Sequence, residues 1–392
     1  MGKIIAVEDA HAAALAAKMA NVDVVAAYPI TPQTHIVEEL SRMVAEGELD
    51  AEYINVESEH SALSACIGAS AVGARCFTAT AGQGLALMHE ILFIAAGNRF
   101  PIVMAIANRC LSPNINIWGD QSDIMSSRDC GWIQIFAENA QEIFDLILAA
   151  FKIAEDERVM LPVAVNFDGF YATHVVERME LPSEEEVRRF LPPHRRQTGY
   201  LLNPDKPLTF GAIGFPSIQF ELRRQWEEAL CRSKQVIKEV WREFEEVFGR
   251  RYEVVEGYRM EDAEAAFILM GGSAGTCRTA VDRLREKGCK VGMLKLRLFR
   301  PFPREEILEA TGGLKTLIVV DKHICLGGLG GPLFNDLRSL YYGSKSSIDV
   351  VGFIAGIGGR DIRVEDFERM FERTIRGEIP PEKYVFLVRG EA

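Results

Sequence analysis

The sequence lacks paired cysteines. Its eight cysteines are spread over 392 residues, and no two of them form a C-x-x-C pair. Iron–sulfur clusters and structural zinc sites are held by thiolates that recur at short spacings, so this chain is not expected to hold either centre alone. We expect the eight thiols to be reduced and mostly buried, because an isolated cysteine behaves as a small apolar side chain.

The sequence also lacks long apolar runs and an excess of basic over acidic residues. The most apolar region, residues 85–107, is broken by charged side chains and a proline, whereas a membrane-spanning helix needs about 20 mostly apolar residues. The first 20 residues meet acidic side chains at once and lack a signal-peptide core. The formal net charge of -12 is opposite to the basic footprint of nucleic-acid-binding proteins. These absences predict a cytoplasmic protein that binds neither membranes nor nucleic acid.

The first half of the chain alternates strand and helix patterns. The expected strands are β-branched, apolar runs at 22–30, 51–56, 76–80, 101–109 and 161–169. The expected helices lie between them at 32–47, 58–74, 84–98 and 141–157. Continuous apolar strands that alternate with helices predict a parallel sheet with both faces covered.

The second half begins with a connector. Residues 181–216 are rich in proline, glycine and charge and are expected on the surface. Residues 217–249 predict one long amphipathic helix with Gly249 as its C-cap glycine. From about residue 262 a further series of strands and helices predicts a smaller α/β unit. We therefore expect two domains, 1–250 and 251–392.

Three polar residues fall where expected strands give way to loops or helices. Thr31 lies in YPITPQT (28–34), Glu59 in NVESEHSA (55–62), and Arg109 ends PIVMAIANR. Open α/β sheets bind ligands at such strand ends. Structural roles remain open: Thr31 suits an N-cap with Pro32 at the first helical position, Glu59 complements a helix macrodipole, and Arg109 suits a surface ion pair. From these residues we infer a ligand crevice without naming its ligand.

A glycine turn after a strand in the second unit, MGGSAGT (270–276), offers an alternative. It does not match G-x-G-x-x-G and lacks the lysine of a phosphate-binding loop. A free-standing nicotinamide enzyme is therefore disfavoured, and tight packing between strand and helix explains these glycines better.

Several long motifs resemble one known family. The segment from YPITPQT to RFPIVM (28–104) resembles the α subunit of the multi-subunit pyruvate:ferredoxin oxidoreductases, within the 2-oxoacid:ferredoxin oxidoreductase family. So do INIWGDQSD (115–123), RDCGWIQ (128–134), LKLRLFRPFP (294–303) and FIAGIGGRDI (353–362), whereas GAIGFPSIQF (211–220) departs most. The resemblance covers nearly the whole chain. It implies an α/β fold in which a pyrimidine-binding thiamine-diphosphate domain precedes a smaller domain similar to the transketolase C-terminal domain.

The resemblance also implies roles for individual residues. Thr31 and Arg109 match residues that hold pyruvate, and Pro29 lies with Thr31 in the cofactor-binding segment. Glu59 matches the glutamate that contacts the aminopyrimidine of thiamine diphosphate and serves as its proton partner, whereas Glu57 has the wrong register. The implied reaction is the reversible oxidative decarboxylation of pyruvate with coenzyme A, which gives acetyl-CoA and CO2 and passes electrons to ferredoxin.

The family's diphosphate motif is absent. No GDG is followed after about 25–30 residues by an asparagine that would hold Mg²⁺ and diphosphate, and Gly119-Asp120-Gln121 fails this pattern. The resemblance implies that a β subunit supplies the diphosphate site with its Mg²⁺. It further implies that γ and ferredoxin-like δ subunits complete the assembly and that partner chains carry the [4Fe-4S] clusters. Two alternatives remain: a subunit specific for 2-oxoisovalerate or 2-oxoglutarate, and a non-catalytic assembly subunit.

Overall fold

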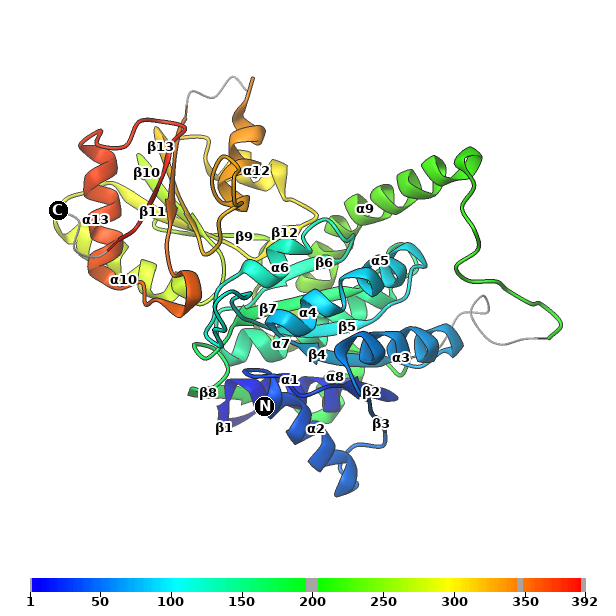
Figure 1. Cartoon of the computed structure of the whole chain (residues 1–392). Coiled ribbons are helices and arrows are strands. Elements are labelled where there is room, and N and C mark those ends of the chain that lie inside the picture. Colours follow the sequence, from blue (N-terminus) through cyan, green and yellow to red (C-terminus); the bar gives the residue numbers. More distant parts are fainter. Residues whose placement is uncertain (1, 195–203, 344–347, 389–392) are drawn as a thin grey trace.

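A computed structural model describes residues 2–194, 204–343 and 348–388. It shows two α/β units, one built on a seven-stranded sheet and one on a six-stranded sheet (Figure 1). The larger sheet has the strand order β12-β6-β7-β5-β4-β2-β3. Its strands are β2 (Val24–Ala27), β3 (Glu52–Asn55), β4 (Cys76–Thr80), β5 (Val103–Asn108), β6 (Ile133–Phe136), β7 (Val163–Asp168) and β12 (Leu298–Arg300).

Strands β2 to β7 are parallel, which confirms the sheet type predicted from the sequence. Their carboxyl ends therefore meet at one edge of the sheet. Helices cover both faces, with α3 to α5 on one side and α1 and α7 on the other (Figure 1). The helices of this unit are α1 (Asp9–Met19), α2 (Thr34–Ala45), α3 (Glu59–Val72), α4 (Gly82–Leu87), α5 (His89–Gly97), α6 (Ser122–Ser126), α7 (Ala140–Glu155) and α8 (Glu184–Phe190).

The long helix predicted for residues 217–249 is confirmed as α9 (Pro216–Phe248). It ends at Gly249, whose left-handed φ of 72° confirms the predicted C-cap glycine. Apolar side chains of its second half, among them Ile237, Trp241 and Phe244, are buried against the larger unit. Its first half projects away from the body of the molecule (Figure 1).

The smaller unit has the strand order β15-β14-β13-β10-β11-β9. Its elements are β9 (Val255–Tyr258), β10 (Ala265–Leu269), α10 (Ser273–Glu286), β11 (Val291–Leu296), α11 (Arg304–Ala310), β13 (Thr316–Asp321), α12 (Pro332–Tyr341), β14 (Asp349–Ile354), η1 (Ile357–Gly359), α13 (Val364–Ile375) and β15 (Tyr384–Phe386). Strand β12 leaves this series and pairs antiparallel with β6 of the larger sheet. The domain boundary between residues 250 and 251 stays a prediction.

A buried ionic cluster joins the two units. Glu142 of α7 accepts hydrogen bonds from Lys295 Nζ at 2.6 Å and Arg297 Nη2 at 2.8 Å. Glu256 of β9 accepts another from Arg297 at 2.6 Å. Burial alone would raise the pKa of Glu142 and of Glu256, but Arg297 and Lys295 outweigh it, so both pKa values are lowered, that of Glu256 to about 2.

The cysteines are less buried than the sequence predicted, because Cys231 is exposed and Cys110, Cys289 and Cys325 are only partly buried. No disulfide joins the eight cysteines, and Cys66, Cys76, Cys130 and Cys277 are buried. Within the described ranges, histidine, cysteine and carboxylate side chains form no group of three that could hold a metal ion. None of the helices among the described residues combines the length and the apolar character needed to cross a membrane.

Candidate active site

The carboxyl edge of the larger sheet brings together the segments that carry the three predicted residues. Strand β4 lies between β5 and β2, so the loops that follow β2 and β5 meet across its end. Arg109 directly follows β5, and Thr31 lies in the loop between β2 and α2. Glu59 is the first residue of α3, which leads from β3 to β4.

The Arg109 side chain crosses this edge to the Thr31 segment. Its Nη1 donates to the Thr31 carbonyl oxygen at 3.0 Å, and its Nε donates to the Asn116 carbonyl oxygen at 2.9 Å. Arg109 is 6% exposed and forms no ion pair with any residue that the structure describes. Burial lowers the pKa of its guanidinium, and the charge of Asp123 partly opposes that shift. The predicted surface ion pair is therefore absent, and the site contains a buried cation.

Two glycines of α4 make room for the Arg109 and Glu59 side chains. A Cβ on Gly82, whose φ is 48°, would lie 2.9 Å from Arg109 Cδ. A Cβ on Gly84 would lie 2.5 Å from Glu59 Oε1 and 2.6 Å from Thr80 Oγ1. Because carbon and oxygen atoms do not approach so closely without displacement, a side chain at either position would force the Arg109 or the Glu59 side chain to move.

Glu59 is buried, whereas Glu57 is exposed and accepts a hydrogen bond from the Ser61 hydroxyl. Ser58 caps α3 by accepting from the Ser61 backbone N–H at 3.2 Å. Glu59 thus lies in the first turn of a helix, where its charge also complements the macrodipole. The Glu59 carboxylate and the Thr80 hydroxyl both lie against Gly84, and the buried Thr80 hydroxyl has no hydrogen-bond partner among the described residues.

The predicted capping role of Thr31 is wrong. Helix α2 begins at Thr34, and its N-cap residue is Gln33. The Gln33 side chain is turned inward, where its Nε2 donates to the Ala79 carbonyl oxygen of β4 at 2.6 Å. This contact fixes the loop after β2 to the end of β4, and residues 31–33 form a turn before the helix.

The Thr31 side chain and Pro29 are both exposed at this edge. Thr31 meets Arg109 through its carbonyl oxygen and not through its hydroxyl. The structure thus brings Thr31 and Arg109 into contact and places Glu59 beside the same short helix that Arg109 crosses. Gln33 was missed by sequence reasoning, because a glutamine before a helix carries no sign that its amide binds a strand 46 residues away.

The smaller unit closes one side of this edge. Asp168, at the end of β7, accepts from Gly272 N at 2.7 Å and from Lys322 Nζ at 2.6 Å. The glycine turn after β10 therefore serves close packing between the units. Asn116, which accepts from Arg109, also donates to the Gly358 carbonyl oxygen at 3.1 Å. Beside this contact lies a cavity of about 590 Å³ between residues 110–118 and 357–360.

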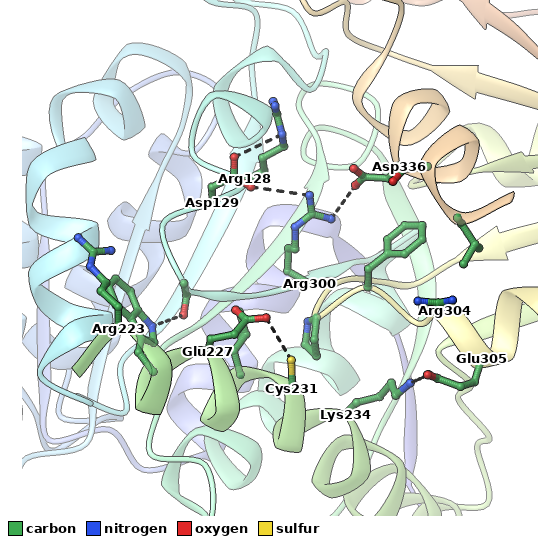
Figure 2. A pocket seen from close by; sticks show the side chains of 17 residues that line it. Arg128, Asp129, Arg223, Glu227, Cys231, Lys234, Arg300, Arg304, Glu305 and Asp336 are labelled. Atoms are coloured by element: carbon green, nitrogen blue, oxygen red, sulfur yellow. Dashed lines mark hydrogen bonds and ion pairs between the residues drawn. The ribbon is translucent and has the colours of Figure 1, made fainter. Parts of the chain in front are cut away.

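A second cavity, of about 1000 Å³, lies between α9, the segment after β12 and α12 (Figure 2). Its charged side chains are largely paired with one another. Arg300 pairs with Asp336 at 2.9 Å, and Lys234 binds Glu305 and Glu306. None of Thr31, Glu59 and Arg109 lines it, so it is separate from the strand-end site.

Two family models match the chain. Residues 15–242 match the thiamine-diphosphate-binding domain of pyruvate flavodoxin/ferredoxin oxidoreductases, and residues 263–367 match pyruvate:ferredoxin oxidoreductase core domain II. The pyruvate synthase subunit PorA of Methanocaldococcus jannaschii is 50% identical over 96% of both chains. The ketoisovalerate oxidoreductase subunit VorA of Pyrococcus abyssi is 46% identical over 92% of this chain and 91% of that relative.

A solved 2-oxoglutarate:ferredoxin oxidoreductase from Magnetococcus marinus has the same fold. Its TM-score is 0.75 at 20% identity, and the match covers 95% of this chain and 65% of that chain. This likeness and the family models confirm the predicted α/β fold, in which a thiamine-diphosphate-binding domain precedes a smaller α/β unit. The chain belongs to the pyruvate:ferredoxin oxidoreductase family.

Proposed function

We propose that this chain is the α-type subunit of a pyruvate:ferredoxin oxidoreductase and supplies the pyrimidine and pyruvate side of a shared thiamine-diphosphate site. The buried Arg109 guanidinium carries this proposal. It has five N–H donors, and its two hydrogen bonds to described residues both go to backbone carbonyl oxygens. A buried cation that forms no ion pair with any described side chain is costly, and the planar carboxylate of a 2-oxoacid matches its remaining donors.

The residues around Glu59 fit the aminopyrimidine end of the cofactor. The buried Glu59 carboxylate lies against Gly84 together with the Thr80 hydroxyl, which has no hydrogen-bond partner among the described residues and could donate to a cofactor. Glu59 would donate or accept a hydrogen bond at a pyrimidine ring nitrogen and hold the proton exchanged there. When bound, thiamine diphosphate supplies the carbon nucleophile and the electron sink for decarboxylation.

The other predicted site residues have matching roles. Arg109 holds the substrate carboxylate, and the Thr31 carbonyl oxygen keeps the guanidinium turned toward the loop after β2. The exposed Thr31 hydroxyl hydrogen-bonds the substrate, and Pro29 borders the cofactor. The smaller unit contacts this edge through the hydrogen bond between Asn116 and Gly358.

The missing parts of the reaction belong to other chains in this proposal. The sequence has no diphosphate motif and no clustered cysteines, so a β subunit holds diphosphate and Mg²⁺, and γ and ferredoxin-like δ subunits complete the complex with [4Fe-4S] clusters on partner chains. The name of the Methanocaldococcus jannaschii relative, a pyruvate synthase subunit, supports such an assembly. Coenzyme A accepts the acetyl group, and ferredoxin accepts the electrons. The cytoplasmic location stays a prediction.

A second candidate function is the oxidation of a branched 2-oxoacid. The ketoisovalerate subunit of Pyrococcus abyssi is 46% identical, close to the 50% of the Methanocaldococcus jannaschii pyruvate synthase subunit. Arg109 would hold the carboxylate of either substrate, so the distinction depends on the rest of the pocket. A non-catalytic role in assembly is the third candidate.

A substrate panel tests these alternatives. The complex, purified from its source with its partner chains, is assayed with coenzyme A and an electron acceptor on pyruvate, 2-oxoisovalerate and 2-oxoglutarate. We expect kcat/KM to be highest for pyruvate, and a higher value for 2-oxoisovalerate would favour the second candidate. A Glu59→Gln complex should assemble normally yet lose about 10²-fold or more in kcat. Undiminished turnover would leave only the assembly role.

A further inference from the structure

Asp123 is a buried carboxylate beside the site that has no assigned role. It lies in the short helix α6 and is 0% exposed. Its Oδ2 accepts from the backbone N–H of Gly82 at 2.9 Å and from that of Arg109 at 2.8 Å. Its Oδ1 accepts from Asn108 Nδ2 at 3.0 Å and from its neighbour Ile124 N at 2.8 Å. One carboxylate therefore ties the end of β5, the start of α4 and α6 together.

Burying such a carboxylate in its charged form costs free energy. Burial raises the pKa of Asp123 to about 7, although the backbone donors of Arg109, Gly82 and Ile124 act in the opposite direction. Asp123 has no ion pair with the residues that the structure describes. Buried charged groups of this kind persist where their hydrogen bonds set a geometry that an apolar residue cannot set.

Asp123 holds two backbone groups that support the Arg109 side chain. Oδ2 fixes the backbone N–H of Arg109, from which the side chain starts. The same oxygen fixes Gly82, against which the chain lies, because a Cβ there would be 2.9 Å from Arg109 Cδ. From this support the guanidinium reaches the Thr31 and Asn116 carbonyl oxygens.

We propose that Asp123 is a positioning residue that acts through Arg109: it locks the start of that side chain and its Gly82 support to one oxygen and so aims the guanidinium at the substrate carboxylate. This inference rests on the proposed binding of a 2-oxoacid by Arg109. Asp123 itself does not touch the substrate.

A double-mutant cycle in the purified complex tests the proposal. Asp123→Asn keeps the shape but replaces one acceptor oxygen with an NH2 group, which cannot accept from the N–H donors. We expect KM for the 2-oxoacid to rise about tenfold, with a smaller change in kcat. In an Arg109→Ala background the same substitution should leave KM within about twofold, because the side chain it aims is gone.

Asp321→Asn is the matched control. Asp321 is also a buried carboxylate, with its pKa raised by burial to about 7, and it accepts from Leu333 N and Phe334 N at the start of α12, in the smaller unit. We expect its substitution to lower Tm without changing KM. If Asp123 had only a structural role, Asp123→Asn would lower Tm without changing KM, as expected for Asp321→Asn. Alternatively, Asp123→Asn would change KM equally with and without the Arg109 side chain. Either result overturns the proposal.

If the Asp123→Asn complex does not assemble, Asn108→Ala replaces it in the cycle. That substitution keeps the carboxylate and removes one of its four donors, so a smaller rise in KM is expected, again only when Arg109 is present. An unchanged KM in this variant overturns the proposal. Every assay uses the 2-oxoacid that the wild-type complex turns over fastest. If that substrate is not pyruvate, the proposed function fails while the cycle still decides the role of Asp123.

Discussion

Gly84→Ala should impair catalysis more than it impairs folding. The added methyl carbon would lie 2.5 Å from Glu59 Oε1 and 2.8 Å from Glu59 Cγ. Rotation of the carboxylate can relieve the first contact but not the second, because Cγ lies nearer the backbone. The Glu59 side chain must therefore move as a whole, by about 0.9 Å if Oε1 is to reach an ordinary contact near 3.4 Å.

The two consequences differ in size. Alanine favours a helix over glycine by about 1 kcal/mol, while overpacking costs about 1–3 kcal/mol, so the free energy of unfolding should fall by no more than about 2 kcal/mol. A displacement of about 1 Å in a reacting group can lower the rate about 10²-fold. We expect kcat of the complex to fall by that factor at saturating substrate and thiamine diphosphate.

The assay compares this variant with Gly97→Ala. Gly97 ends the neighbouring helix α5, and a Cβ there would lie 3.7 Å from Trp226, an ordinary contact. The control should keep its wild-type kcat. The reasoning is refuted if Gly84→Ala, in an assembled complex of normal Tm, turns over within about twofold of wild type, because Glu59 would then not need its observed place.

The remaining predictions concern Arg109 and the ionic cluster. Arg109→Lys keeps the charge but loses the planar fork, so steady-state KM for the 2-oxoacid should rise about tenfold; an unchanged KM would contradict a forked contact. Gly82→Ala should raise the same KM, because its methyl group would meet Arg109 Cδ at a φ of 48°. The pKa values of Glu142 and Glu256 are lowered by folding, so their stabilisation is complete above about pH 4.5 and is lost as the pH falls toward 2. The free energy of unfolding, measured with denaturant, should fall between pH 7 and pH 3.5 as this stabilisation is lost. In a Glu142→Gln variant the free energy of unfolding should depend less on pH.

Much of the sheet could be predicted because strands and helices carry local patterns. The run at 76–80 coincides with β4, and the predicted helix 217–249 with α9 to within a residue. Helix α1 escaped notice because seven of its eleven residues are buried and alanine dominates it, which leaves no polar face to give a period. Strand β12 could not be placed, because its pairing with β6 joins residues about 160 apart in sequence.

For the candidate site too, local sequence patterns predict where residues lie, whereas contacts between distant parts of the chain decide how their side chains are oriented. The positions of Thr31, Glu59 and Arg109 at one edge of the sheet could be predicted because parallel strands deliver their carboxyl ends to one edge, whereas their roles stay predictions. The orientation of these side chains could not be predicted, because it depends on polar groups that come from distant parts of the chain. Gln33 binds the carbonyl oxygen of Ala79, and Asp123 binds the backbone of Gly82.

A buried aspartate and an exposed one look the same in a sequence, so only the fold reveals which carboxylate forms part of a site. Asp120 and Asp123 stand three residues apart, and both are buried. Asp120 Oδ2 accepts from Gly358 N of the smaller unit at 3.0 Å, whereas both oxygens of Asp123 are bound within the larger unit at the strand edge. Substitution of Asp120 should therefore act on how the units sit together, and substitution of Asp123 on how Arg109 meets its substrate. The difference between these two chemically identical side chains lies in which hydrogen-bond donors, from the backbone and from side chains, the fold presents to them.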